Sequence, residues 1–304
     1  MERVAAAWPL LVAEVLMFGT AAFFLLIAPT ANFLEEGLGR AFESVWRVLA
    51  LVTLVCSPLA LLINTADMAG VSFGAALPLL PQVLWGTHFG HVWTWSFAAT
   101  VALLMVARLP IPTATRARGL CVFAALLLLF GSLMSHAIDT GALAVGVHFI
   151  HQIAAALWLG AIAGLWLGGA GTGYGAVWVQ HAAPRVSRLA GWTVLVLVLT
   201  GLGSSYSALG AHPDRLVDTE YGRTLLVKVG AAALVLLIGA SNRYHMLSTL
   251  AKDTARSALL RNVRIESLLL ILILGLAALL ANTPPAPERP LRAAATTAAR
   301  GNAH

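Results

Sequence analysis

The stretch ALAVGVHFIHQIAAALWLGAIAGLWLG, residues 142–168, contains no Asp, Glu, Lys or Arg. About 20 consecutive, mostly apolar residues are enough for one helix to cross the hydrocarbon core of a membrane. Residues 142–168 therefore predict a transmembrane helix. Its outer turns carry two histidines, His148 and His151, in otherwise apolar surroundings.

Seven further stretches are also long and mostly apolar, although they carry a few charged residues, and they run over residues 8–30, 41–66, 89–108, 117–138, 186–209, 222–246 and 260–282. Of the 304 residues, 59% are hydrophobic and only 11% are charged, whereas a soluble domain carries about 25% charged residues. No soluble fold of this size hides so much apolar surface. The sequence predicts an all-α fold, a polytopic membrane bundle of about eight transmembrane helices.

One domain is the simplest division, because we find no internal repeat and no large soluble segment between the helices. We assign residues 1–285 to a single transmembrane bundle. The tail 286–304 lacks apolar periodicity, and we expect it to be disordered. The first apolar run has Glu14 in its middle and no basic segment before it, so we expect a spanning helix there and no cleavable signal peptide.

Lys and Arg are unevenly distributed among the connections between the predicted helices. The odd-numbered connections carry several each, and the second and fourth carry none. Cytoplasmic loops are enriched in Lys and Arg, so the odd connections are predicted inside and both termini outside, in the periplasm of a Gram-negative cell. The formal charge of +6 reflects this topology in a lipid bilayer. It gives no reason to expect a nucleic-acid partner.

Five of the nine histidines fall at the outer end of the predicted helices, and Met134 lies beside one of them. The candidate metal ligands are His88, His91, His136, His148, His151 and Met134. A polar side chain in a spanning helix is costly and marks a functional site by default. Imidazole suits copper and zinc, and thioether sulfur suits Cu(I). The pattern predicts a metal site near the outer surface.

Other polar residues support this site or lie at the opposite end. Glu14 and Met17 on the first helix, and Tyr221 and Lys228 on the seventh, lie toward the outside. Lys228 is a candidate partner for Glu14 or for an anionic group of a ligand. The predicted cytoplasmic end has a polar cluster of Arg185, Arg188, Asn242, Arg243 and Glu266. Arg243 and Glu266 are candidates for an ion pair that closes this end; the alternative is that these charges only anchor the helix ends at the membrane surface.

Short motifs follow one another in order from about residue 86 to residue 285. They are Thr87-His88-Phe89-Gly90 with Trp93, Ser135-His136-Ala137, His148-x-x-His151 running into Ala154-Ala155-Ala156-Leu157-Trp158-Leu159-Gly160, Arg185-x-x-Arg188, Thr219-x-Tyr221-Gly222-x-x-Leu225-Leu226-x-Lys228, Asn242-Arg243, Glu266 and Pro284-Pro285. This series resembles the copper resistance D (CopD) family of bacterial inner-membrane proteins. The first two helices match that family only in hydropathy, and His91 lies outside its pattern.

The resemblance implies copper passage across the bacterial inner membrane and a periplasmic copper carrier of the CopC type as partner. The bound ion would be Cu(I) or Cu(II), held by membrane histidines. We therefore expect a protein that captures copper on the periplasmic side and imports or delivers it across the membrane. We expect no enzymatic activity, because the chain has no motif for nucleophilic catalysis or nucleotide binding.

The same residues leave a second function open, that of a b-type cytochrome. Haem iron can be held by two histidines from different helices, such as His136 or His88 with His148 or His151. Lys228 would then pair with a propionate group. Such a protein would transfer electrons or reduce copper, and a strong Soret band in the absorption spectrum would identify it.

Overall fold

The computed structural model describes residues 2–27, 35–135, 137–171, 175–209, 214–246 and 253–283. Eight helices in these ranges are long and apolar enough to cross a membrane, which confirms the predicted all-α membrane bundle. They are α1 (Glu2–Ile27), α2 (Glu35–Ala69), α5 (His88–Arg108), α6 (Thr113–Leu133), α8 (Ala142–Gly171), α9 (Gly175–Leu209), α11 (Glu220–Ser241) and α12 (Asp253–Ala281). The predicted tail 286–304 lies outside the described residues.

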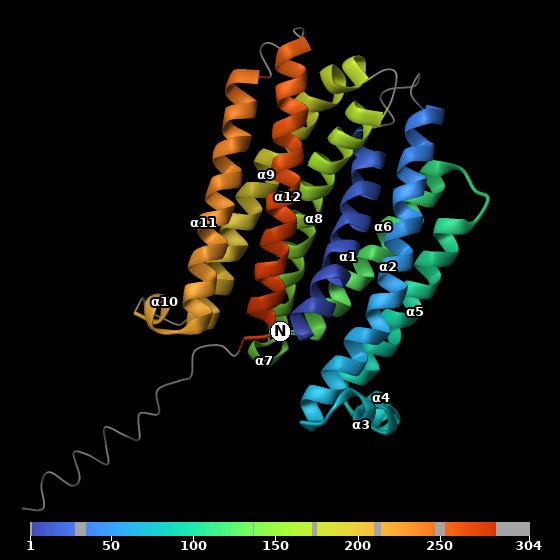
Figure 1. The fold of residues 1–304 in the computed structure, drawn as a ribbon, viewed down its shortest axis with the longest axis vertical. Helices are drawn as coiled ribbons and strands as arrows, with labels where there is room; N and C mark the ends of the chain where they lie inside the picture. Colours follow the sequence, from blue (N-terminus) through green and yellow to red (C-terminus); the bar gives the residue numbers. More distant parts are fainter. Residues whose placement is uncertain are drawn as a thin grey trace, which may run out of the picture.

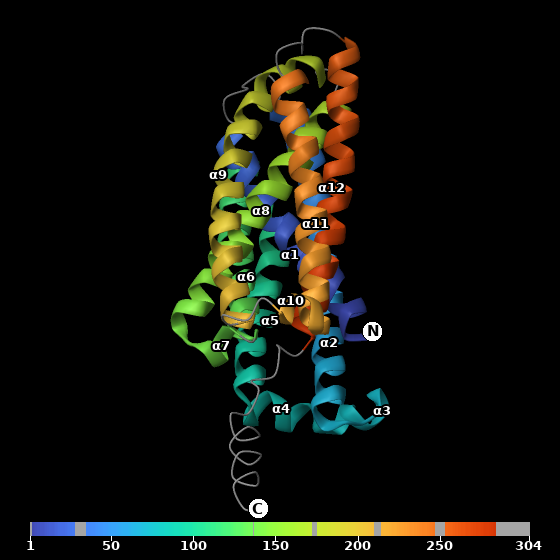
Figure 2. The ribbon, with the colours of Figure 1, turned by 90° about the vertical axis from the view of Figure 1, so that its left-hand side faces the viewer.

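Short elements connect or extend these helices. They are α3 (Phe73–Ala76), the 3-10 turn η2 (Leu77–Leu79), α4 (Leu80–Gly86), α7 (Ala137–Thr140), α10 (Arg215–Asp218) and the π-helical segment η3 (Asn242–Met246). Figure 2 shows α3 and α4 lying across the ends of α2 and α5, at the end of the bundle where the N-terminus also lies. Because the beginnings of α5 and α8 lie at this end too, we call it the histidine end. The side of the membrane that it faces stays a prediction.

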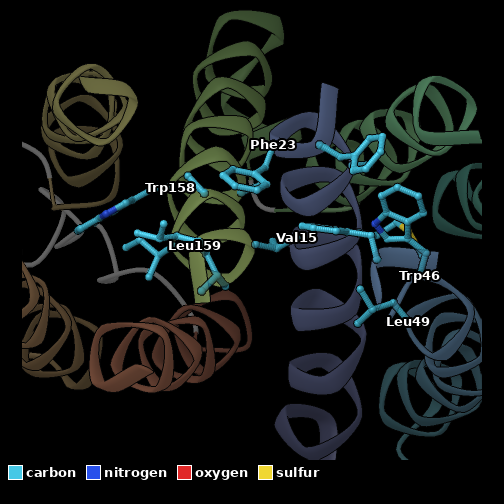
Figure 3. Packing of buried hydrophobic residues seen from close by; sticks show 14 of the residues in the cluster. Val15, Phe23, Trp46, Leu49, Trp158 and Leu159 are labelled. Atoms are coloured by element: carbon cyan, nitrogen blue, oxygen red, sulfur yellow. The ribbon is translucent and has the colours of Figure 1, made fainter. Parts of the chain in front are cut away.

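Helices α1 and α8 pack against each other at the centre of the bundle (Figure 1). Gly19 of α1 and Gly160 of α8 meet so closely that a Cβ atom on either would overlap the backbone of the other. Small residues permit such close approach of membrane helices. Figure 3 shows Val15 and Phe23 of α1 directed toward α8, and Trp46 of α2 on the opposite side of α1.

The packing divides the bundle into two similar halves, which the sequence did not reveal. In the first half α1 packs on α2 and α6, and α5 packs on α6; in the second, α8 packs on α9 and α12, and α11 packs on α12. Across the halves, α6 also contacts α8, just as α12 contacts α1. This pattern is that of two four-helix units related by a two-fold axis between α1 and α8.

A shared local motif supports this relation. Thr87 caps α5 and Thr219 caps α11, and each hydroxyl accepts a hydrogen bond from the N–H three residues on, at 2.9 Å from Gly90 and 3.0 Å from Gly222. Each hydroxyl also donates to the carbonyl four residues back. A Cβ atom on either glycine would overlap the preceding short helix. The corners before α5 and α11 are therefore built in the same way.

The halves differ at one seam. In the first half, α2 packs against α5, whereas the equivalent helices α9 and α11 barely contact each other within the described residues. Only 11% of the span residues of α9 and of α11 are buried, against 33% for α2 and for α5. Figure 3 shows the ribbons of α9 and α11 apart, with the buried Trp158 of α8 between them.

Candidate metal site at the histidine end

The two histidines of α8 are held by hydroxyl groups on two different helices. His148 Nδ1 lies 3.2 Å from Ser132 Oγ on α6, and His151 Nδ1 lies 2.8 Å from Thr200 Oγ1 on α9. Residues three apart on a helix differ by about 60° in direction, which is why the rings reach different neighbours. Both side chains are partly buried.

The hydroxyl partners decide which ring nitrogen carries the hydrogen. Ser132 Oγ donates to the carbonyl of Leu128 at 3.0 Å, and Thr200 Oγ1 donates to that of Val196 at 2.7 Å. With its one hydrogen committed, each hydroxyl oxygen accepts from the imidazole. Nδ1 is then the N–H of both rings, and each Nε2 keeps a lone pair available to a metal ion.

Gln152 also approaches His148. Its amide nitrogen is 3.3 Å from Nδ1, while its Oε1 is buried with no hydrogen-bond partner. A half-turn of the amide brings Oε1 to Nδ1 as a second acceptor for the same hydrogen. His148 thus has two candidate acceptors for its Nδ1–H, whereas His151 has the single, shorter bond to Thr200.

The end of α6 brings the other candidate ligands toward His148. His88 Nε2 lies 3.4 Å from the carbonyl of Leu133, the residue between Ser132 and Met134. His88 of α5 and His148 of α8 therefore contact neighbouring residues of one helical turn. Met134 caps that turn and is partly buried. His136 follows two residues later and lies outside the described residues.

His91 is directed elsewhere. Its Nε2 is 3.1 Å from the carbonyl of Trp85 in α4, and its side chain is exposed. Among the side chains that the structure describes, no three or more His, Cys, Asp and Glu groups are arranged to hold a metal ion. The predicted ligand set of five histidines and Met134 therefore stays a prediction. Within it, His148 and His151 are the two residues whose rings are held by hydroxyl groups of neighbouring helices.

The supporting residues have separate surroundings. Met17 is fully buried in the apolar core, and Glu14 is 9% exposed on the same helix. Tyr221 is half-buried in the first turn of α11. Neither Glu14 nor Lys228 has an ion-pair partner within the described ranges, so the expected bridge between them is not formed. Lys228 is half-buried on α11.

At the end opposite the histidine end, the candidate ion pair between Arg243 and Glu266 is not formed. The side-chain amide of Asn242 donates to Glu266, and Asn262 donates to Asn242 Oδ1 at 2.8 Å. Arg243 donates instead to the carbonyl of Ser187 on α9, at 3.1 Å. Adjacent residues point about 100° apart on a helix. Only one of the two can face Glu266, which is 4% exposed, and a neutral amide costs less to bury than a guanidinium.

The remaining cytoplasmic candidates do not join this cluster. Arg185 donates to the carbonyl of His181 in its own helix, at 2.7 Å. Arg188 is exposed. The five polar residues predicted as one group are therefore divided. Asn242 of η3 contacts the buried Glu266 of α12, Arg243 is linked to α9, and Arg185 and Arg188 lie apart from both on α9.

Sequence reasoning missed the hydroxyl partners of the histidines. Ser132 and Thr200 are 16 and 49 residues away from the rings they contact. Serine and threonine are common in membrane helices, where they usually bond to their own backbone. No sequence signal separates these two from the other hydroxyl residues of the chain.

Two protein-family models match the sequence of this chain. The model for copper resistance protein D matches residues 180–280, and the model for the copper resistance protein D-like N-terminal domain matches residues 3–145. The second match extends the resemblance to the first two helices.

Two characterised relatives are similar over most of the chain. Copper transport protein CutJ of Bacillus subtilis is 27% identical over 243 residues, which are 74% of this chain and 43% of CutJ. Inner membrane protein YebZ of Escherichia coli is 24% identical over 248 residues, 80% of this chain and 83% of YebZ. The chain thus spans less than half the length of CutJ. No solved structure matches it. With the two family models covering most of the bundle, the chain belongs to the copper resistance protein D family.

Proposed function

We propose that this multi-pass inner-membrane protein captures copper on the periplasmic side through its histidines and imports or delivers it across the membrane. One observation carries the proposal. His148 and His151, on the central helix α8, each have Nδ1–H held by a committed hydroxyl, which leaves Nε2 as the metal-binding atom. A hydrogen bond from the ring nitrogen that does not bind the metal is typical of metal-ligating histidines. The family matches support copper as the metal.

Copper would reach this pair from the end of α6. His88 contacts the same helical turn as His148, Met134 ends that turn, and His136 follows it two residues later in the sequence. We propose that these three residues take copper, as Cu(I) or Cu(II), from a periplasmic carrier of the CopC type. The protein acts in this scheme as a carrier and not as an enzyme.

The alternative of a bis-histidine haem b is less well supported. His148 and His151 are on one helix and turn toward different neighbours, so they cannot be the two axial ligands of a single iron. On α9, the residue that meets the His151 ring is Thr200. A haem would need His136 or His88 opposite His148 or His151, and an absorption spectrum without a Soret band excludes it.

The test compares cells that express the wild type, His148→Ala, His151→Ala and a control, His245→Ala, at the opposite end. We expect purified wild-type protein and the control to bind copper and the two site variants to bind it at least tenfold more weakly. Cells that express either site variant should also contain less copper than cells that express the wild type or the control. Copper binding unchanged in both site variants would disprove the proposed site, and lost binding with unchanged cellular copper would disprove uptake.

A further inference from the structure

The segment Phe73–Gly86, made of α3, η2 and α4, is an apolar connection between two spanning helices, and we call it the connecting segment. It contains no Asp, Glu, Lys, Arg or His, and Gln82 is its one polar side chain. Its large apolar side chains nevertheless lie at the surface of the bundle: Phe73 is 40% exposed, Leu77 is 55% exposed and Trp85 is 73% exposed. Ala76 is its one buried residue.

The length and place of the connecting segment limit what it can be. In a membrane protein, an apolar stretch of about 10–14 residues is a buried core helix, a re-entrant or interfacial segment, or part of a signal peptide. The exposure of its side chains excludes a core helix, and its place between α2 and α5 excludes a signal peptide. Figure 2 shows it lying across the ends of α2 and α5 and not turning back into the bundle. Its geometry is that of an interfacial segment.

The length of α5 gives the depth of this segment in the membrane. Helix α5 begins two residues after Gly86, has 21 residues and carries Arg108 in its last turn. At 1.5 Å per residue it is about 31 Å long, and the hydrocarbon core of a bilayer is about 30 Å thick. Because a basic residue at the end of a span marks one boundary of this core, Gly86 lies at the other boundary, at the level of the lipid headgroups.

The equivalent corner of the second half lies at a similar depth and has the opposite chemistry. Helix α11 has 22 residues, and the short helix α10 before it carries Arg215 and Asp218, with Asp214 in front of it. Such a corner is compatible with water. The threonine cap and the close glycine contact are present at both corners, so this local fold does not require an apolar connection. The apolar character of the connecting segment therefore reflects its surroundings.

We propose that the connecting segment is an interfacial anchor, seated among the lipid headgroups of the leaflet at the histidine end, with Phe73, Leu77 and Trp85 in contact with lipid. Tryptophan is enriched at this level of a membrane, where its ring contacts apolar groups and its N–H remains near water. An uncharged surface with large exposed apolar side chains is stable there and unfavourable in water.

The anchor is joined directly to two of the candidate ligands. His91 Nε2 lies 3.1 Å from the carbonyl of Trp85. Gly90 packs against the backbone of the connecting segment so closely that a Cβ atom there would overlap it. Lipid contact at Trp85 thus fixes the first turn of α5, and with it His88, at the membrane surface. The same anchoring holds whether or not the histidines bind copper.

The experiment compares a single cysteine at two matched positions, Leu77→Cys in the connecting segment and Val217→Cys in α10. These residues are 55% and 64% exposed at the same end of the bundle, so they react alike if both face water. Cys56 and Cys121 are replaced by alanine in both variants, and size-exclusion chromatography checks folding. The full chain is reconstituted, without any partner protein, in vesicles of phosphatidylethanolamine and phosphatidylglycerol. Reaction with a membrane-impermeant maleimide is then measured relative to complete labelling in denaturant.

We expect Leu77→Cys to react about tenfold more slowly than Val217→Cys, because the reaction needs a thiolate in contact with water. A fluorophore attached at position 77 should be quenched more strongly by a nitroxide on the lipid headgroup than by one at the end of an acyl chain. Equal reaction rates would place the segment in water, where its apolar surface fits a protein partner, and would overturn the inference. Stronger quenching from the chain end would overturn it too, because the segment would then be re-entrant. Both measurements are made without copper, so their failure leaves the proposed function intact.

Discussion

Replacing Thr200 by valine removes the acceptor of His151 Nδ1–H and leaves the shape of the side chain almost unchanged. The bond is 2.8 Å long, and no other group in the described part of the chain hydrogen-bonds to that nitrogen. Without it, the imidazole loses both its fixed orientation and its preference for the tautomer with a free Nε2. Loss of such a partner typically weakens metal binding by about 10- to 100-fold, or about 1.4 to 2.8 kcal/mol.

The structure also predicts how much the loss of the hydroxyl partner of His148 weakens copper binding, relative to the loss at His151. Ser132 Oγ is 3.2 Å from His148 Nδ1, and the side-chain amide of Gln152 is available at 3.3 Å as a replacement. Ser132→Ala should therefore weaken copper binding less than Thr200→Val does, toward the lower limit of that range. A larger loss in Ser132→Ala would contradict the assigned partners.

The assay is chelator competition for copper on purified variants, with thermal unfolding as the check on folding. Thr193→Val is the matched control, because Thr193 lies on the same helix and its hydroxyl bonds only to the carbonyl of Ala190. In a His151→Ala background, Thr200→Val should have no further effect, since the two residues act through one bond. Wild-type affinity in Thr200→Val, or an equal loss in Thr193→Val, would refute the reasoning.

Two predictions concern stability, and both are checked by thermal unfolding and size-exclusion chromatography. Gly160→Ala puts a methyl group into the backbone of Gly19, and we expect at least about 1–3 kcal/mol of destabilisation, whereas Gly146→Ala, with open space around its Cβ, should fold normally. Glu43→Ala leaves the guanidinium of Arg116, which is 5% exposed and paired with Glu43, without its carboxylate, and we expect a loss of about 3 kcal/mol. Unchanged unfolding in either variant would contradict the packing described.

The spanning helices could be predicted because membrane insertion depends on length and hydropathy, both of which are read directly from sequence. Their ends were less predictable. The predicted helix 186–209 is α9, which begins at Gly175 and continues through Pro184, and the predicted helix 260–282 is α12, which begins at Asp253. The added turns contain charged and polar residues. Hydropathy marks only the part of a helix that lies in the membrane, whereas backbone hydrogen bonding continues beyond it.

The candidate site could be predicted only at the level of residue type and depth. The position of His88, His148 and His151 at one end of the bundle follows from helix order, and the structure confirms it. That Asn242 and not Arg243 meets Glu266 depends on rotation about the helix axis. Hydropathy does not determine this rotation in a helix surrounded partly by lipid and partly by protein.

The two halves share their packing but supply different parts of the candidate site. Equivalent helices repeat the Thr87 and Thr219 corners and the contacts around α1 and α8, yet the sequence analysis found no repeat, because lipid-facing positions accept almost any apolar residue. The first half supplies His88 and Ser132, and the second half supplies His148, His151 and Thr200. The candidate site therefore depends on residues that the shared packing leaves free to differ between the halves.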